Sequence, residues 1–325
     1  MLTYLLLTAS AGFIEIGVLI YALETGVPIW LLPAIAATYQ VSNYAQGPFR
    51  PRPLTCLFLS LGSLVLGFLM RDSVVTLVGY TVSISWAIQG ARDALKKGIS
   101  ISRTLKRAVR LIGFICSFMY GWKVAVVVLA GVGIAGATLS FGDSTGNIRN
   151  KWGAIETGWL SSLMLLHQVH YFAYYFMMPA YFHNRYGLPW WALSLTFPVG
   201  WVSYIVAHYV WRSTQKWVFV VGHFVSFVCI IGLVVSHNLW LSLLWWFLTG
   251  FGGGTIYVLR NWSRSLKWEQ SLDFWETCGH VIGPFLVIAP LLSGGGVEVA
   301  MVFAGIMALI VALSAMAEAW RPVSE

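Results

Sequence analysis

The amino-acid sequence predicts an all-α membrane protein with about twelve transmembrane helices in two six-helix halves. Of its 325 residues, 58% are hydrophobic and only 10% are charged, which leaves too little polar surface to cover a soluble core of this size. The apolar residues come in blocks of roughly 17 to 22, the length that crosses a hydrocarbon layer of about 30 Å. Each block should be a helix, because backbone groups must bond internally there and no block alternates as barrel strands do.

The expected spans fall into two groups of six. In the first half they cover residues 2–23, 28–46, 54–70, 73–91, 105–120 and 124–141, and in the second half 157–180, 188–211, 217–236, 239–258, 273–292 and 297–319. This division predicts an N-terminal bundle over 1–141, a cytoplasmic linker over 142–156 and a C-terminal bundle over 157–325. The first block has no basic segment before it and no small-residue cleavage site, so we expect a retained helix rather than a signal peptide.

The positions of the basic residues predict the orientation. If both termini are cytoplasmic, 17 of the 20 Lys and Arg residues lie on that side, and only Arg71, Lys123 and Arg185 lie on the other. Such asymmetry is what the positive-inside rule describes. The sequence therefore predicts a multi-pass protein of the plasma (inner) membrane with both ends inside. The net charge of +8 lies in short loops between apolar blocks, so no nucleic-acid partner is expected.

The sequence carries no sign of a cofactor. Cys56, Cys116, Cys229 and Cys278 all fall inside apolar blocks without CxxC spacing, as small core residues do. The chain contains no GxxxxGK[ST] segment, which excludes an ATP-driven step within it. We therefore expect neither a cofactor nor an enzyme, and a monomer whose surroundings are the lipid bilayer.

The two halves share two features. A Gly-x-Pro-x-Trp segment follows the first span of each half, at Gly26–Trp30 and again 161 positions later at Gly187–Trp191. A glycine ends one helix there, and a proline near the start of the next costs no backbone donor. A basic loop follows the fourth span of each half, running from Arg92 to Arg110 and from Arg260 to Lys267.

On these residues the chain resembles the major facilitator superfamily over nearly its whole length, as a compact and divergent member. Gly252-Gly253-Gly254 and the segment Glu276…Gly279…Gly283-Pro284 add to the resemblance. The loop between the second and third spans, Gly47–Pro53, keeps the glycine and basic residues of the family motif but lacks its Asp and following glycine. The resemblance implies two parallel six-helix repeats and transport by alternating access around a site near the membrane midplane.

Glu15 is the first candidate functional residue. It lies in the middle of the first span, where a carboxylate is costly and is expected to face a cavity, to be protonated or to hold helices together by hydrogen bonds. We assign it the coupling of proton movement to transport, facing the histidines of the seventh span.

The seventh span is the most distinctive segment. His167, His170 or Tyr171, Tyr174, Met178 and Tyr181 recur every three to four residues, so they should form one stripe along a helix. The resemblance implies that this helix faces the central cavity, where imidazole and phenol groups suit a polar or aromatic organic ligand. Structural packing is one alternative. Another is a metal ion held by His167 and His170, with a further ligand from His208, His280 or Glu15.

Other polar residues suggest gates and interfaces. Glu276 and His280 share a face of the eleventh span, as do Tyr204 and His208 on the eighth. Glu276 could pair with Arg260 or Arg264 of the preceding loop and close the cytoplasmic mouth. His223 and His237 are expected at the membrane interface. The group Arg103, Lys106, Arg107 and Arg110 has helical spacing and should begin an amphipathic helix on anionic headgroups.

Together these features predict a secondary active transporter, coupled to protons, that exports a small organic molecule. A membrane metalloenzyme built on the histidines is a second hypothesis. It is weakened because the seven histidines are scattered and form a single HxxH. A transport-inactive scaffold or sensor with the same fold is a third, suggested by the altered Gly47 loop.

Overall fold

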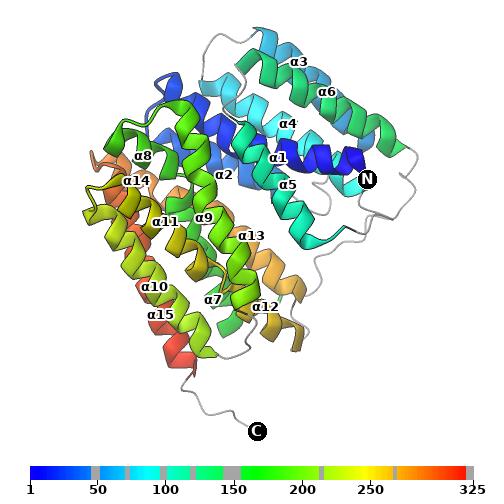
Figure 1. Ribbon diagram of the computed structural model, residues 1–325. Helices are drawn as coiled ribbons and strands as arrows, with labels where there is room; N and C mark the ends of the chain where they lie inside the picture. Colours follow the sequence, from blue (N-terminus) through cyan, green and yellow to red (C-terminus); the bar gives the residue numbers. More distant parts are fainter. Residues whose placement is uncertain are drawn as a thin grey trace. The chain divides into compact units, whose positions relative to one another are not determined.

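The computed structural model describes residues 1–44, 52–69, 74–95, 101–117, 122–141, 155–211, 216–265 and 269–319, and every regular element in these ranges is a helix. The chain divides into two compact units (Figure 1). The first comprises Met1–Lys151 and Leu188–Leu195, and the second comprises Trp152–Gly187 and Thr196–Glu325.

The first unit is built around α1. Its helices are α1 (Leu2–Glu24), α2 (Leu31–Tyr44), α3 (Pro53–Leu69), α4 (Val74–Leu95), α5 (Arg103–Cys116) and α6 (Trp122–Ser140). Helix α1 packs most extensively on α5 and also on α4 and α6, while α3 packs on α4 and α6. Helix α5 starts where Ser102 accepts a hydrogen bond from the backbone N–H of Leu105 at 3.2 Å, a cap that satisfies a donor of the first turn.

The second half of the chain contains α7 (Trp159–Tyr175), α8 (Met178–Tyr186), α9 (Trp190–Val210), α10 (Lys216–Val235), α11 (Leu239–Gly253), α12 (Ile256–Ser265), α13 (Glu269–Leu286), α14 (Ile288–Leu292) and α15 (Val297–Ala319). Helix α7 packs on α13 and α15, and α10 packs on α15 and α11. The buried core of the second unit draws on α7, α10, α12, α13 and α15, through residues such as Met164, Phe219, Leu259 and Val311.

The all-α prediction is confirmed, and the chain is an integral multi-pass membrane protein. Six segments of the described residues are long and apolar enough to cross a membrane, by length and composition: Leu2–Glu24, Trp190–Ala207, Lys216–Val235, Leu239–Ser263, Ser271–Leu292 and Val297–Glu318. Two shorter apolar helices, Pro53–Leu66 and Val127–Ser140, add to them. The expected count of twelve spans stays a prediction.

Three expected spans prove to be interrupted helices. The seventh breaks after Tyr175, the tenth at Gly254 and Thr255, and the eleventh at Val287. Pro179 and Pro290 explain two of the breaks, because a proline has no N–H to give the carbonyl four residues earlier. The break in the tenth span begins at the last of three consecutive glycines, which hold a helix weakly. The interruption at Tyr175 corrects the expectation of one continuous stripe, since Met178 and Tyr181 lie on α8.

The glycines of the repeated segment end their helices alike. Gly26 after α1 has φ +74° and Gly187 after α8 has φ +62°, in the left-handed region that glycine enters without steric cost. Gly26 N–H donates to the carbonyl of Leu23 at 3.1 Å, and Gly187 N–H donates to that of His183 at 2.8 Å. The seventh expected span therefore ends at Tyr186 rather than near residue 180.

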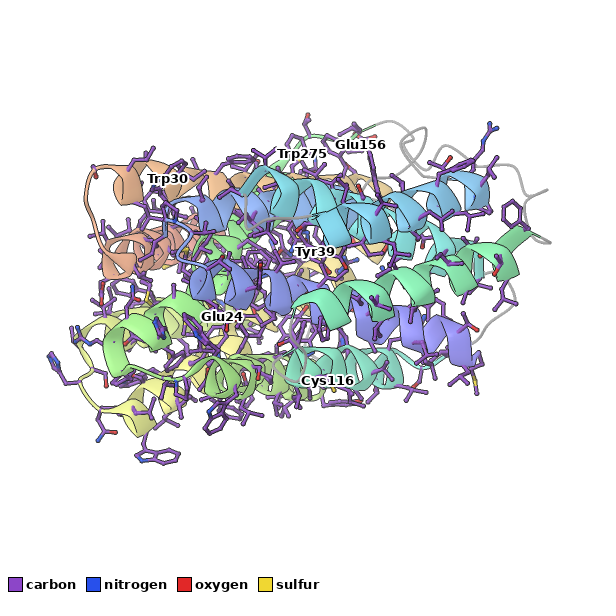
Figure 2. All side chains as sticks on the ribbon, turned by 90° about the horizontal axis from the view of Figure 1, so that it is seen from above. Glu24, Trp30, Tyr39, Cys116, Glu156 and Trp275 are labelled. Carbon is purple, nitrogen blue, oxygen red and sulfur yellow. The ribbon has the colours of Figure 1, made fainter. Side chains whose placement is uncertain are left out.

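Helices α7 and α13 touch at their backbones. A side chain at Gly279 would put its Cβ 2.4 Å from Cβ of Gln168, and one at Gly283 would meet the carbonyl oxygen of Val169 at 2.7 Å. Small residues four apart allow helices in membranes to approach this closely. The start of α13 is also tied to the segment before α7, because Trp275 Nε1 donates to the carbonyl of Glu156 at 3.1 Å (Figure 2).

Candidate functional site

Glu15 forms a buried ion pair with Arg110 in the first unit. The Glu15 side chain is 3% exposed and that of Arg110 is 18% exposed. Arg110 donates from Nη2 and, at 3.0 Å, from Nε to the same oxygen, Oε2 of Glu15. Tyr39 on α2 reaches that oxygen at 3.5 Å and donates to the carbonyl of Ala11 at 3.0 Å. The carboxylate is therefore surrounded by donors from α2 and α5.

Close packing of α1 and α5 brings the two charges together. An added Cβ at Gly12 would lie 2.4 Å from the carbonyl oxygen of Arg110, and one at Gly113 would lie 2.0 Å from that of Ala9. Any larger residue at these glycines would separate the helices. For Arg110 the expectation of a headgroup contact was wrong, because its guanidinium turns to Glu15. Lys106, one turn earlier, lies 5.5 Å from the centre of the Tyr4 ring.

Three histidines gather in the second unit. His167 and His170 on α7 and His223 on α10 each offer a ring nitrogen, and these nitrogens lie within 4.8 Å of one another. His167 Nδ1 lies 2.7 Å from His223 Nε2. The expectation that His223 sits at the membrane interface was wrong, because its side chain is fully buried against α7. His237, by contrast, lies in the exposed turn before α11.

The structure does not bring the other two candidate histidine ligands, His280 and His208, into this group of described residues. His280 on α13 is buried and packs edge-on against Phe172, with ring centres 4.1 Å apart. The group of potential metal ligands includes neither His280 nor Glu15, within the described residues. The side chain of His208 lies outside the described residues.

The tyrosines of the expected stripe have separate surroundings. Tyr171 packs on Tyr204 of α9, with ring centres 6.4 Å apart, and Tyr204 stacks on Trp201 at 5.3 Å. Tyr174 meets Trp246 of α11 edge-on at 6.0 Å. On α8, Met178 is fully buried and the Tyr181 hydroxyl donates to the carbonyl of Leu233 at 2.5 Å. Helix α7 therefore presents imidazoles to α10 and phenols to α9 and α11.

Arg260 forms an ion-pair cluster with two carboxylates. It lies on α12 rather than in a loop, and it pairs with Glu276 and, at 3.1 Å, with Asp273 on α13. The Glu276 side chain is 16% exposed. The side chain of Arg264 lies outside the described residues. His280, one turn after Glu276, faces Phe172 of α7 instead.

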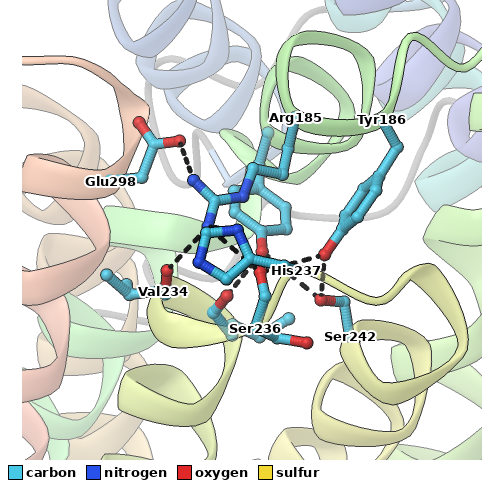
Figure 3. Close-up of polar contacts among 9 residues, drawn as sticks. Arg185, Tyr186, Val234, Ser236, His237, Ser242 and Glu298 are labelled. Atoms are coloured by element: carbon cyan, nitrogen blue, oxygen red, sulfur yellow. Dashed lines mark hydrogen bonds and ion pairs between the residues drawn. The ribbon is translucent and has the colours of Figure 1, made fainter.

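A polar cluster joins α8 to the turn between α10 and α11 (Figure 3). Arg185 donates to the carbonyl of Ser236 and to His237 Nδ1, each at 3.1 Å, and lies 3.8 Å from Glu298 on α15. The Tyr186 hydroxyl lies 2.6 Å from that of Ser242. Arg185 is one of the three basic residues that the charge pattern leaves on the non-cytoplasmic side. Its contacts with Ser236, His237 and Glu298 give it a structural role there.

Comparison with known proteins yields matches in structure alone. No protein-family model matches the chain, and no curated protein matches its sequence. A bacterial metal transporter aligns with a TM-score of 0.67 at 11% identity, covering 98% of this chain and 97% of that one. A bacterial homologue of the iron transporter ferroportin aligns at 0.67 and 12% identity, with 97% of each chain covered.

A bacterial homologue of the human lysosomal transporter Spinster aligns with a TM-score of 0.62 at 12% identity, covering 97% of this chain and 95% of that one. At these identities the matches establish the fold. The chain has the fold of major facilitator transporters, as the resemblance implied.

Proposed function

We propose that this protein is a secondary active transporter that works by alternating access, with twelve spans and both termini in the cytoplasm. The fold it shares with solved transporters supports the mechanism, and the charge asymmetry of the sequence supports the orientation. One of those structures is named as a metal transporter and one as a homologue of an iron transporter, while the name of the Spinster homologue gives no substrate. At these identities the shared fold leaves the substrate of this chain open. The plasma (inner) membrane is the proposed location.

The buried Glu15–Arg110 pair is the observation that carries proton coupling. Two charges removed from water are costly to keep, and replacing such a pair with apolar residues is often neutral or stabilising. A carboxylate with an adjacent guanidinium has two alternatives, since it can hold a proton or pair with the arginine. Exchange between these states would change the contact between α1 and α5 once in each cycle.

The proposed substrate is a small organic molecule with aromatic or polar groups, and the proposed direction is outward. Support for the substrate comes from the half-buried rings of Trp201 and Tyr204 beside Tyr171, since stacking on aromatic faces favours flat organic groups. The Arg260, Glu276 and Asp273 cluster is the proposed cytoplasmic gate, because an ion pair between adjacent helices can be broken and remade during rocking.

Proteoliposomes containing the purified protein test the coupling. Ethidium, tyrosine and benzoate serve as cationic, zwitterionic and anionic aromatic probes, and their movement is measured with and without a pH gradient. We expect at least one probe to move in response to the gradient, and Glu15→Gln to abolish that response. Glu24→Gln, at the exposed end of the same helix, is the matched control and should behave as the unmodified protein. Transport that ignores both the gradient and Glu15→Gln would disprove the coupling.

A further inference from the structure

We propose that His167, His170 and His223 form a binding site for a divalent transition metal ion of the zinc class. The three side chains come from α7 and α10 and are 2%, 0% and 0% exposed. Their ligand nitrogens lie within 4.8 Å of one another. The site lies wholly inside the second unit, so the inference does not depend on the proposed transport function.

Two of the rings already have the orientation and tautomer that a metal requires. His170 Nδ1 lies 2.6 Å from the carbonyl oxygen of His167, and His223 Nδ1 lies 2.8 Å from that of Phe219. A carbonyl oxygen only accepts, so each Nδ1 carries the hydrogen and each Nε2 has a lone pair. Metal-binding histidines are commonly held in this way, with the second nitrogen donating to a backbone carbonyl.

The Nε2 lone pair of His170 is a buried acceptor. Among the described residues, no hydrogen-bond donor lies within reach of it. Buried polar atoms are nearly always hydrogen-bonded, and an exception calls for an explanation such as an ion. A metal ion between the three rings would satisfy this nitrogen.

The spacing of the other two rings is close to that of a metal site. His223 Nε2 accepts a hydrogen bond from His167 Nδ1 at 2.7 Å. A tetrahedral ion with nitrogen ligands at about 2.0–2.1 Å holds those nitrogens roughly 3.3 Å apart. Binding would therefore increase the distance between these two nitrogens by about 0.6 Å. It would also move the hydrogen of His167 from Nδ1 to Nε2, with no net change in the number of protons.

The donor set selects the class of ion. Three imidazoles suit zinc, cobalt, nickel, copper and iron, whereas magnesium and calcium prefer carboxylate and carbonyl oxygens. Among the described residues, the group of His167, His170 and His223 includes no carboxylate or thiolate. Three protein ligands leave a fourth position of a tetrahedral ion for water. The Phe219 ring, centred 4.1 Å from that of His223, lines one side of the site.

Binding is measured on the full chain purified in detergent, without a polyhistidine tag and after treatment with a chelator. Zn²⁺ is titrated by calorimetry, and Co²⁺ is titrated by visible absorption, which distinguishes tetrahedral from octahedral coordination. We expect one ion per chain and a tetrahedral Co²⁺ spectrum. His170→Gln and His223→Gln each remove a ligand, so each should weaken binding by more than the roughly 10–100-fold that the loss of a hydrogen-bonding partner of a ligand costs. His237→Gln, which removes an exposed histidine (Figure 3), should leave it unchanged.

A cysteine substitution covers the case in which the glutamine variants fail to fold. His223→Cys keeps a ligand at this position, and thiolate binding to Co²⁺ adds a charge-transfer band in the near ultraviolet. Appearance of that band supports direct ligation. The proposal is overturned if the unmodified protein binds neither ion, or if binding is unchanged in both glutamine variants. Because no gradient or substrate is used, failure here leaves the transport proposal standing, and failure of transport leaves this result standing.

Discussion

His167 and His223 are separated by 56 residues in the chain, yet their ring nitrogens lie 2.7 Å apart between α7 and α10. This contact divides the polar side of α7 into two parts. The imidazoles face α10 inside the second unit, whereas Tyr171 faces Tyr204 on α9. A site for a metal and a surface for an aromatic substrate can therefore occupy the same helix without competing for the same side chains.

The Glu15–Arg110 pair should behave as a coupled unit in unfolding experiments. Arg110→Met leaves a buried carboxylate without its counter-ion, and we expect the free energy of unfolding to fall by about 3–5 kcal/mol. Glu15→Gln should cost less, because the Arg110 side chain is 18% exposed and can reach water. The double variant Glu15→Gln/Arg110→Met should recover much of the loss. Denaturation in detergent measures all four proteins, and simply additive effects would contradict the coupling.

The backbone contact of α7 and α13 should be sensitive to a single methyl group. Gly279→Ala places Cβ 2.4 Å from the Cβ of Gln168 and 2.8 Å from the carbonyl oxygen of Leu165, and neither atom is the end of a flexible side chain. We expect a loss of about 1–3 kcal/mol, as for overpacking elsewhere.

Gly62→Ala is the matched control for this glycine. Gly62 lies on α3 with open space around its Cβ position, so alanine there should be neutral or slightly stabilising through its better helix propensity. Melting temperatures of the two variants in the same detergent provide the comparison. Equal melting temperatures would show that α7 and α13 can separate at no cost.

The Arg260 cluster should control access to the N-terminal half of α13, where Asp273 and Glu276 lie. In a background where Cys278 is the sole cysteine, Arg260→Gln removes the bond to Glu276 and Asp273, and we expect an impermeant maleimide to label Cys278 several-fold faster. Cys278 is half-buried two residues after Glu276, close enough to report the opening. Arg185→Gln, which breaks a different ion pair on α8, should leave the labelling rate unchanged. Equal rates in all three proteins would rule out a gate here.

The helices could largely be predicted because apolar blocks have a length that the bilayer dictates. The start of α15 and the two ends of α10 fall within a residue of expectation. The interruption of α7 was missed because Tyr175 and Phe176 continue the apolar block across it. Pro179 was a readable signal, since the carbonyl of Tyr175 loses its donor.

The partners of the candidate residues could not be predicted in the same way. Helical spacing shows which side chains share a face of one helix, but it says nothing about which helix lies opposite. Arg110 belongs to a basic cluster that resembles a headgroup anchor, and its pairing with Glu15 depends on the glycines that let α1 and α5 touch. His223 was assigned to the interface from its position near a helix end. Both residues still carry a signal, because a buried carboxylate or histidine is costly unless it finds a partner.

The three interrupted helices have a mechanical consequence. All of them lie in the second half of the chain, while α1, α3, α4 and α6 run without a break through the described residues of the first unit. A continuous series of backbone hydrogen bonds keeps a helix straight, and a helix kinks where that series is interrupted. We expect the helices of the second unit to bend at Tyr175, Gly254 and Val287. The continuous helices of the first unit should move without bending. The two units would then contribute unequally to any conformational cycle.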